Sequence, residues 1–208
     1  MKKLLIPCIL LICLPLFSSC EKRILSFPAT FSRTEIFTLD EAGGAFSESS
    51  TITADDIRNA LDLPDDADIT SVNIEALSAS VELLEANEAS TITVSGSIDE
   101  IGGSQDFMFQ NYVIPLDGII GLNTPFIGVN PLIAAGISKL KTKIESFLLG
   151  LGSQQSFDVA VSGTSSPGGA RVAVQLYLKI QMSMEYKICV DVAKDFVEGG
   201  EKCEDEPE

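Results

Sequence analysis

The clearest hydrophobic pattern lies near the C-terminus, in RVAVQLYLKIQMSMEYKICVDV (residues 171–192). Every even-numbered residue from Val172 to Val192 is apolar, and the residues between them are mostly polar. A two-residue period is typical of a strand with one buried and one exposed face. Because ordinary strands span about 3–10 residues, the pattern predicts one unusually long strand. We expect it to bend and cross between two sheet regions, with its first third paired to residues 156–163 across the TSSPGG turn.

Shorter apolar stretches separated by turn residues lie between residues 26 and 163. SFPATF and EIFTL lead into AGGAFSESS, which we interpret as a loop-rich passage, and TITVSGSI, DFMFQNYVIP and SFDVAVSG are further strand candidates. In SVNIEALSASVELL (residues 71–84) the apolar positions are even up to Ile74 and odd from Leu77 onwards. A bulge near Glu75 and Ala76 would keep both halves on one buried face.

Two segments have helical features instead. Thr53 stands three residues before Asp56, a capping arrangement that predicts a short helix over about 54–63, ending at Pro64. A second helix is predicted over about 131–150, with Asn130 as its cap and Pro131 in its first position. Its apolar residues recur at intervals of three and four, at Ile133, Ile137, Leu140, Ile144, Phe147, Leu148 and Leu151.

These elements together predict a mainly β fold. Strands with one apolar face need a partner layer, and the amphipathic helix needs a surface to cover. We therefore expect an antiparallel sandwich-like or curled sheet, with the helix packed on or in it. The expected organisation is a single β-rich domain over 27–193, followed by an acidic, mobile tail over 194–208.

The first twenty residues, MKKLLIPCILLICLPLFSSC, have the layout of an export signal. Lys2 and Lys3 precede an apolar run that ends in two serines and a cysteine. The apolar run is short for a bilayer span, and its prolines disfavour a stable helix. We expect residues 1–19 to be removed as a signal peptide. The alternative is a short anchor that stays on the chain.

The end of this segment, Leu16-Phe17-Ser18-Ser19-Cys20, resembles the lipobox of bacterial lipoproteins. It departs from that pattern in having Phe17 where leucine is commonest. The resemblance implies that Cys20 carries the lipid and that residues 20–26 form a lipidated tether. It also implies a membrane partner, because two or three acyl chains give stable anchoring. Glu21 follows Cys20, where inner-membrane lipoproteins of enteric bacteria commonly have aspartate, so we expect an outer-membrane location in the cell envelope.

The charge of the chain is strongly negative, at −16 for 14 basic and 30 acidic residues. Removal of Lys2 and Lys3 with the signal would leave 12 basic residues and a net charge of −18. Such a surface repels phosphate backbones, so nucleic acid is not an expected partner.

The composition also restricts catalysis. The chain contains no histidine, which excludes Ser-His and Cys-His nucleophile pairs and imidazole metal ligands. Acidic clusters at 55–56 and 65–68 leave a carboxylate pair open, although aspartate is ordinary at turns and helix ends. The spacing of Asp66, Asp68 and Thr70 opens like a calcium loop, but Ser71 and Leu77 replace its essential glycine and glutamate. We predict a non-enzymatic protein with no cofactor or metal site.

Two cysteines remain in the mature chain besides Cys20. Cys189 lies on the polar side of the long strand, and Cys203 lies in the tail within its reach. An even pair in an exported protein indicates a disulfide; two free thiols are the alternative.

Residues 118–138 contain no charge, and their prolines, asparagines and glycines argue against a membrane helix. We interpret them as a loop that is buried or lines a pocket, with Ile119, Ile120, Phe126 and Ile127 as candidate contacts to an apolar ligand.

These sequence features leave two candidate functions. The first is an envelope lipoprotein acting as a structural or binding domain, with another envelope protein as a candidate partner. The second is a carrier of lipid or another apolar ligand, similar in outline to tubular lipid-binding proteins.

Overall fold

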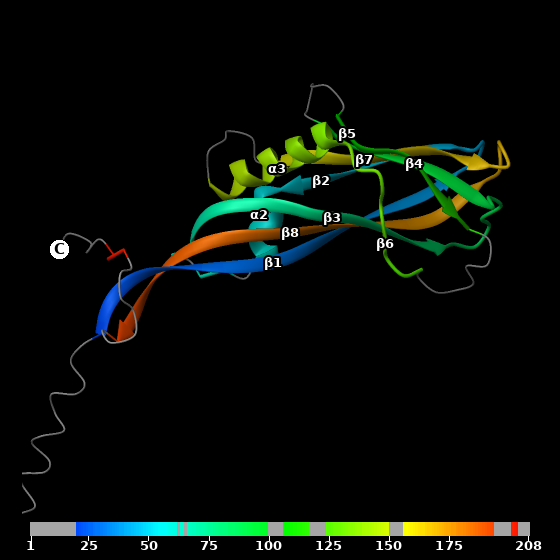
Figure 1. The fold of residues 1–208 in the computed structure, drawn as a ribbon. Helices are drawn as coiled ribbons and strands as arrows, with labels where there is room; N and C mark the ends of the chain where they lie inside the picture. The colour runs from blue at the N-terminus through cyan, green and yellow to red at the C-terminus, as the bar shows by residue number, and fades with distance from the viewer. Residues whose placement is uncertain are drawn as a thin grey trace, which may run out of the picture. The chain divides into compact units, whose positions relative to one another are not determined.

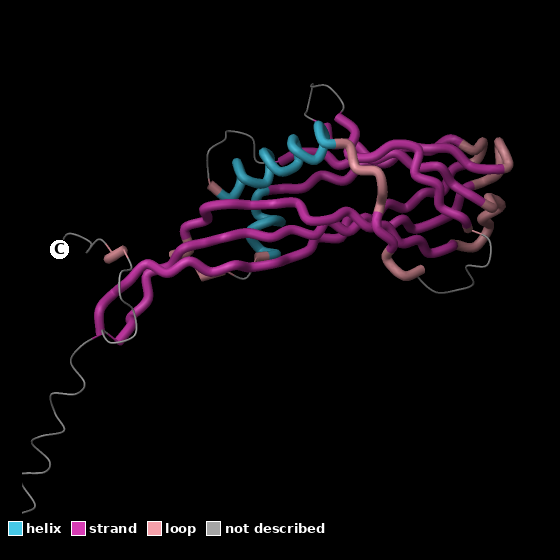
Figure 2. Tube along the Cα trace, viewed as in Figure 1, coloured by secondary structure: helices cyan, strands magenta, loops and turns pink. Residues whose placement is uncertain are grey.

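The computed structural model describes residues 20–61, 63–64, 66–99, 106–116, 124–149, 156–193 and 201–203. Within these ranges strands make up most of the chain, and they form two sheets packed as a sandwich with two helices (Figures 1 and 2). The predicted mainly β, sandwich-like fold is therefore confirmed.

Each sheet has four strands. The first has the order β1–β8–β3–β6, with bounds Cys20–Glu41, Val172–Ala193, Asp68–Leu83 and Ile127–Gly128. The second has the order β2–β7–β4–β5, with bounds Ala45–Thr53, Ser156–Ser166, Thr91–Asp99 and Asp106–Pro115. The helices are α2 (Ala54–Ala60) and α3 (Ala134–Leu148).

The chain divides into two compact units. The larger consists of Pro28–Leu63 and Ile69–Glu185, and the smaller of Met1–Phe27, Pro64–Asp68 and Tyr186–Glu208. Residues 20–26, the expected tether, are the first part of β1. The core and the groove described below belong to the larger unit, and the disulfide belongs to the smaller one.

The core of the larger unit lies between the two sheets. On β8 every even-numbered residue from Val172 to Met184 is at most 2% exposed, which confirms the predicted register over this part of the strand. The even-numbered residues from Tyr186 to Val192 are only partly buried. The opposite sheet contributes Phe157, Val159 and Val161 of β7, among others. On β3 the buried apolar residues are Val72 and then Leu77, Ala79 and Val81, so the predicted change of parity is also confirmed. Ser78 and Ser80, between them, are buried as well.

The partners of β8 differ from the prediction. β8 stays in the first sheet, next to β1 and β3, whereas β7 pairs with β2 and β4 in the second. The predicted hairpin between β7 and β8 is therefore wrong, and β8 does not cross between sheets. The TSSPGG turn is real, but it connects one layer to the other. Because the even residues of β8 and the odd residues of β7 face each other across the core, both strands still show a buried face.

Two Val-Ser-Gly sequences, at 94–96 and 161–163, lie side by side in the second sheet. Val94 is opposite Gly163, and Gly96 is opposite Val161, on the antiparallel strands β4 and β7. Each glycine is covered by a phenylalanine of its other neighbour: a Cβ on Gly96 would lie 2.3 Å from the Phe109 ring, and one on Gly163 2.6 Å from the Phe46 ring. Gly96 thus makes room for the Phe109 ring, whereas Gly163 makes room for the Phe46 ring and for the Thr93 carbonyl oxygen, which would lie 2.0 Å from its Cβ.

Helix α3 begins later than predicted. Its N-cap is Ile133, not Asn130, and no side chain caps it. The Ile133 N–H donates to the carbonyl of Met108 on β5 (2.7 Å), so the preceding backbone is held by the sheet edge and does not enter the helix. Leu140, Ile144 and Phe147 are buried, as the apolar stripe predicts. A Cβ on Gly136 would lie 2.2 Å from the Phe107 carbonyl oxygen, so this glycine lets α3 approach β5 closely.

Two lysines of α3 connect the helix to both sheets. Lys139 pairs with Asp106 of β5 (2.7 Å), and Lys141 donates to Asn73 of β3 (3.1 Å). Since β5 ends the second sheet and β3 belongs to the first, α3 bridges an edge of the sandwich. The Phe147 ring stacks on Phe157 of β7 with centroids 5.5 Å apart, which adds an aromatic contact to the core.

Helix α2 has the predicted capping box. The Asp56 N–H donates to Thr53 Oγ1 (3.1 Å), and the Thr53 N–H donates to Asp56 Oδ2 (2.9 Å). The Thr53 hydroxyl also donates to this carboxylate (2.7 Å). These bonds, with the nearby Arg33 guanidinium, lower the pKa of Asp56 below its ordinary value. The helix ends at Ala60 with Leu61 as its C-cap, before the predicted Pro64.

Replacing Thr53 by alanine should raise the pKa of Asp56 and destabilise the protein by about 1 kcal/mol near neutral pH, as cap removal usually does. A lowered folded pKa stabilises the fold above the unfolded pKa, and this stabilisation is lost as pH falls through the folded pKa. The variant should therefore lose less stability on acidification than the parent. NMR titration of Asp56 and urea unfolding at several pH values are the measurements, with Thr34→Ala, on an exposed position of β1, as control. An unchanged pKa of Asp56 would contradict the assignment.

Candidate functional site

The solvent-facing side of the first sheet carries a continuous row of polar side chains. We call this the outer face; it consists of Gln175, Tyr177, Lys179, Gln181 and Ser183 of β8 with Glu75 and Glu82 of β3. Tyr177 Oη lies 2.8 Å from Glu82 Oε2 and 2.7 Å from Gln175 Oε1. The Ser183 hydroxyl donates to Glu75. The face is thus partly ordered by bonds between neighbouring strands.

Two of the proposed apolar contacts lie beside this face. Phe126 is 46% exposed and Ile127 58% exposed. Lys179 Nζ lies 5.5 Å from the centroid of the Phe126 ring, a cation–π distance. Ile119 and Ile120 lie outside the described residues. The structure therefore brings Phe126 and Ile127 together at the β6 edge, next to Lys179, as surface residues.

A groove of about 410 Å³ opens within the larger unit across β1, β8 and β3. This volume falls in the range of small-molecule sites, about 300–1,000 Å³. Thr30, Ser32, Glu75 and Gln181 line it and are exposed, whereas Met182 is 1% exposed and belongs to the core. Phe31, which is partly buried, also lines the groove. The groove therefore combines exposed polar side chains with two inward-facing apolar residues, Phe31 and Met182.

The sequence reasoning missed this groove. Of its polar residues, the sequence pattern assigned only Gln181 to the exposed side of the long strand. Nothing in the sequence says which residues of three separate strands come together. The alternation on β8 placed Gln181 outward correctly, and that is the only signal that pointed to it.

A second cluster that the sequence reasoning missed surrounds one buried carboxylate, that of Glu35, with partly exposed partners. Glu35 of β1 is 5% exposed, and its carboxylate binds Arg33 on one oxygen and the Ser50 hydroxyl on the other (2.6 Å). Arg33 also lies 3.7 Å from a carboxylate oxygen of Asp56. The signal was present: Arg33 and Glu35 share the parity of the buried Phe37 and Leu39. The bonds join β1, β2 and α2, which indicates a structural role.

The acidic clusters show no catalytic or metal geometry in the part of the chain that the structure describes. Asp55 is exposed at the start of α2, and Asp56 is used in the helix cap. Asp66 and Asp68 are exposed. Among the described residues no group of three or more Cys, Asp or Glu side chains could hold a metal ion. No described helix is long and apolar enough to cross a membrane.

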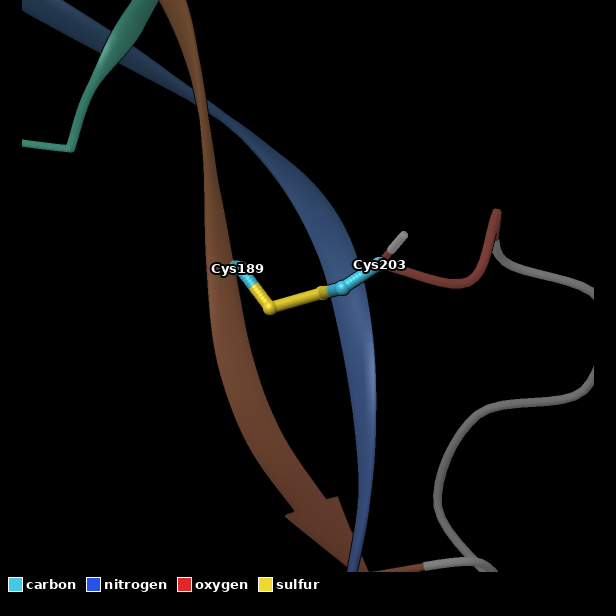
Figure 3. The surroundings of a disulfide bond; sticks show 2 residues. All are labelled: Cys189 and Cys203. Carbon is cyan, nitrogen blue, oxygen red and sulfur yellow. A yellow bond between two sulfur atoms is a disulfide. The ribbon is translucent and has the colours of Figure 1, made fainter. Parts of the chain in front are cut away.

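Cys189 and Cys203 form a disulfide in the smaller unit, with Cα atoms 6.0 Å apart (Figure 3). The chain around Cys203 also bonds to β1, since Arg23 pairs with Lys202 and the Ile24 N–H donates to the Glu201 carbonyl (2.9 Å). Phe27 stacks on Tyr186 with ring centroids 5.8 Å apart. The described part of the tail is therefore attached to both β8 and β1.

Comparison with known proteins identifies no family for this mainly β sandwich. No family model matches the chain, and no curated protein does. Solved structures with a distant likeness include the BFDV capsid protein in a decameric form, 13% identical with a TM-score of 0.36, covering 78% of this chain and 98% of that one. The empty head of turnip yellow mosaic virus is 14% identical with a TM-score of 0.29, covering 82% and 86%.

Proposed function

We propose that this protein is a bacterial envelope lipoprotein, anchored in a membrane through Cys20, that acts as a non-enzymatic binding domain. The observation that carries the anchor is the order of basic, apolar and Ser-Ser-Cys segments at the N-terminus. The strand β1 starts at Cys20 itself. With an acyl group on this residue, little chain would separate the membrane from ordered structure.

The groove across β1, β8 and β3 and the exposed Phe126 and Ile127 support binding as the activity. The even residues of β8 and the odd residues of β7 fill the space between the sheets. An apolar-ligand carrier would need residues 126 and 127 to line an interior channel, and both are exposed.

The absence of histidine and the use of Asp56 in a cap support a non-enzymatic role. We place the protein on the outer membrane, because glutamate follows Cys20.

Replacing Cys20 by alanine should abolish incorporation of labelled fatty acid and leave an uncleaved or soluble precursor. The reason is that only a thiol at this position can form the thioether expected of the lipobox. The measurement is metabolic labelling with a fatty acid in a bacterial host that acylates lipoproteins, followed by fractionation of membranes. Cys13→Ala, within the signal, is the matched control and should label normally. Equal labelling of the Cys20 variant would remove the lipoprotein proposal.

A further inference from the structure

The polar side chains that line the groove have hydrogen-bond acceptors without a partner among the described residues. Glu75 accepts a bond from Ser183 on one carboxylate oxygen. Its other oxygen has no partner among the described residues, and the same holds for the side chains of Thr30, Ser32 and Gln181. Each of these four side chains carries an oxygen that can accept a hydrogen bond. The groove therefore presents several acceptors from three strands to one volume.

Among the residues that the structure describes, no positively charged side chain lines this groove. The two nearest cations along the lining strands are directed elsewhere: Arg33 binds Glu35 and Asp56, and Lys179 lies over the Phe126 ring. Glu75 takes part in no ion pair among the described residues. An exposed carboxylate with unpaired charge on a chain of net charge −16 attracts cations over a distance.

A primary ammonium group fits these features. It has three N–H donors and no acceptor, so it can bind the Glu75 carboxylate together with the amide oxygen of Gln181 and a hydroxyl oxygen of Thr30 or Ser32. Hydrogen bonds to charged groups are stronger than neutral ones. An anionic ligand would meet Glu75 without a compensating cation. A neutral polyol could use the hydroxyls but would gain nothing from the negative field of the chain.

We propose that the groove between β1, β8 and β3 binds a primary ammonium group, supplied by a polyamine or by a lysine side chain of a protein partner. This inference deepens the proposed binding function and rests on it for biological meaning. The lipid anchor is tested separately, by fatty-acid labelling of the Cys20 variant. A negative result in the ammonium-binding test would therefore not affect the lipoprotein proposal, and the reverse also holds.

The test is calorimetric titration of the full-length protein in a non-ionic detergent at low salt. The probes are ethylammonium, spermidine and a capped Gly-Lys-Gly peptide. Glu75→Gln should weaken ethylammonium binding about ten-fold or more, because it removes the negative charge and leaves the ammonium group a weaker hydrogen bond to a neutral amide oxygen. The matched control is Glu85→Gln, which removes the same charge from an exposed position outside the groove and should change binding less than about two-fold, the effect of screened long-range charge.

A quaternary ammonium probe distinguishes hydrogen bonding in the groove from general attraction to the negative charge of the chain. Ethyltrimethylammonium carries the same charge but has no N–H, so it should bind at least about ten-fold more weakly than ethylammonium. Gln181→Ala provides a second variant should Glu75→Gln not fold. Stronger binding of spermidine identifies a polyamine as the source, and stronger binding of the peptide identifies a lysine side chain. Equal effects of the Glu75 and Glu85 changes, equal binding of both monoamines, or binding of a neutral oligosaccharide in preference to every amine would overturn the proposal.

Discussion

Replacing Arg33 by methionine should destabilise the protein by about 3–5 kcal/mol, the range found when one partner of a buried ion pair is removed. Glu35 would then stay in the sandwich with the Ser50 hydroxyl as its remaining partner from the described cluster. The Glu35 side chain is only 6% exposed and that of Arg33 22%, so water replaces the guanidinium only in part. The free energy of unfolding in urea is the measurement.

Two controls make this result specific to burial. Arg171→Met removes an arginine that pairs with Asp40, but these side chains are 44% and 51% exposed. Exposed pairs contribute about 0–1 kcal/mol, so this variant should be nearly as stable as the parent. The double change of Arg33 and Glu35 to methionine should recover much of the lost stability, because it leaves no unpaired charge. Similar losses for the two arginine variants would show that the Arg33 cluster is not buried.

Replacing Met182 by aspartate should have an effect of similar size, about 3–5 kcal/mol, because an uncompensated charge enters the core. Met182 is 1% exposed, whereas its neighbour Gln181 is exposed. Gln181→Asp should cost about 1 kcal/mol or less, because its carboxylate stays in solvent and meets only the Glu75 charge in the same groove. The two variants differ only in the face of β8 that receives the carboxylate, so they test the register of the strand.

The pH dependence of the Met182 variant gives a second readout. Burial favours the neutral form of a carboxyl and raises its pKa. A raised folded pKa means that the charge destabilises the fold at high pH and that the penalty decreases as pH falls. The loss of stability, measured by urea unfolding, should therefore be smaller at acidic pH than at neutral pH. A loss that is independent of pH would indicate poor packing in place of charge burial.

The sequence predicted the features that depend on local periodicity. The alternation on β8 predicted its length and buried face, and the three-and-four spacing of Leu140, Ile144 and Phe147 predicted the buried side of α3. The capping box of Thr53 and Asp56 was also predicted. These features depend only on residues that are close in the chain. The local sequence pattern is therefore enough to predict which side of a strand or helix is buried and where the helix is capped.

Features that depend on distant partners could not be predicted in the same way. The turn between β7 and β8 is visible in the sequence, but whether it joins neighbours in one sheet or opposite sheets depends on β2 and β4, which pair with β7 instead. The start of α3 depends on a backbone bond between Ile133 and Met108. The groove needs Thr30, Glu75 and Gln181 from three strands. An uncharged segment likewise does not reveal that Phe126 is on the surface.

Within the smaller unit, the beginning of β1 is bonded to two segments that the disulfide joins to each other. That strand bonds to β8 in the sheet, and to residues 201–203 through the Arg23–Lys202 pair, while the Cys189–Cys203 bond joins these two partners covalently. Linking two binding segments converts the second contact into an intramolecular event with a high effective concentration. If the bonds between β1 and one of these segments break, the disulfide and the remaining bonds keep that segment close enough to β1 to rebind at once. For a chain anchored at Cys20, as proposed, this avidity would stabilise the residues next to the membrane, which are the first to bear a force transmitted through the lipid.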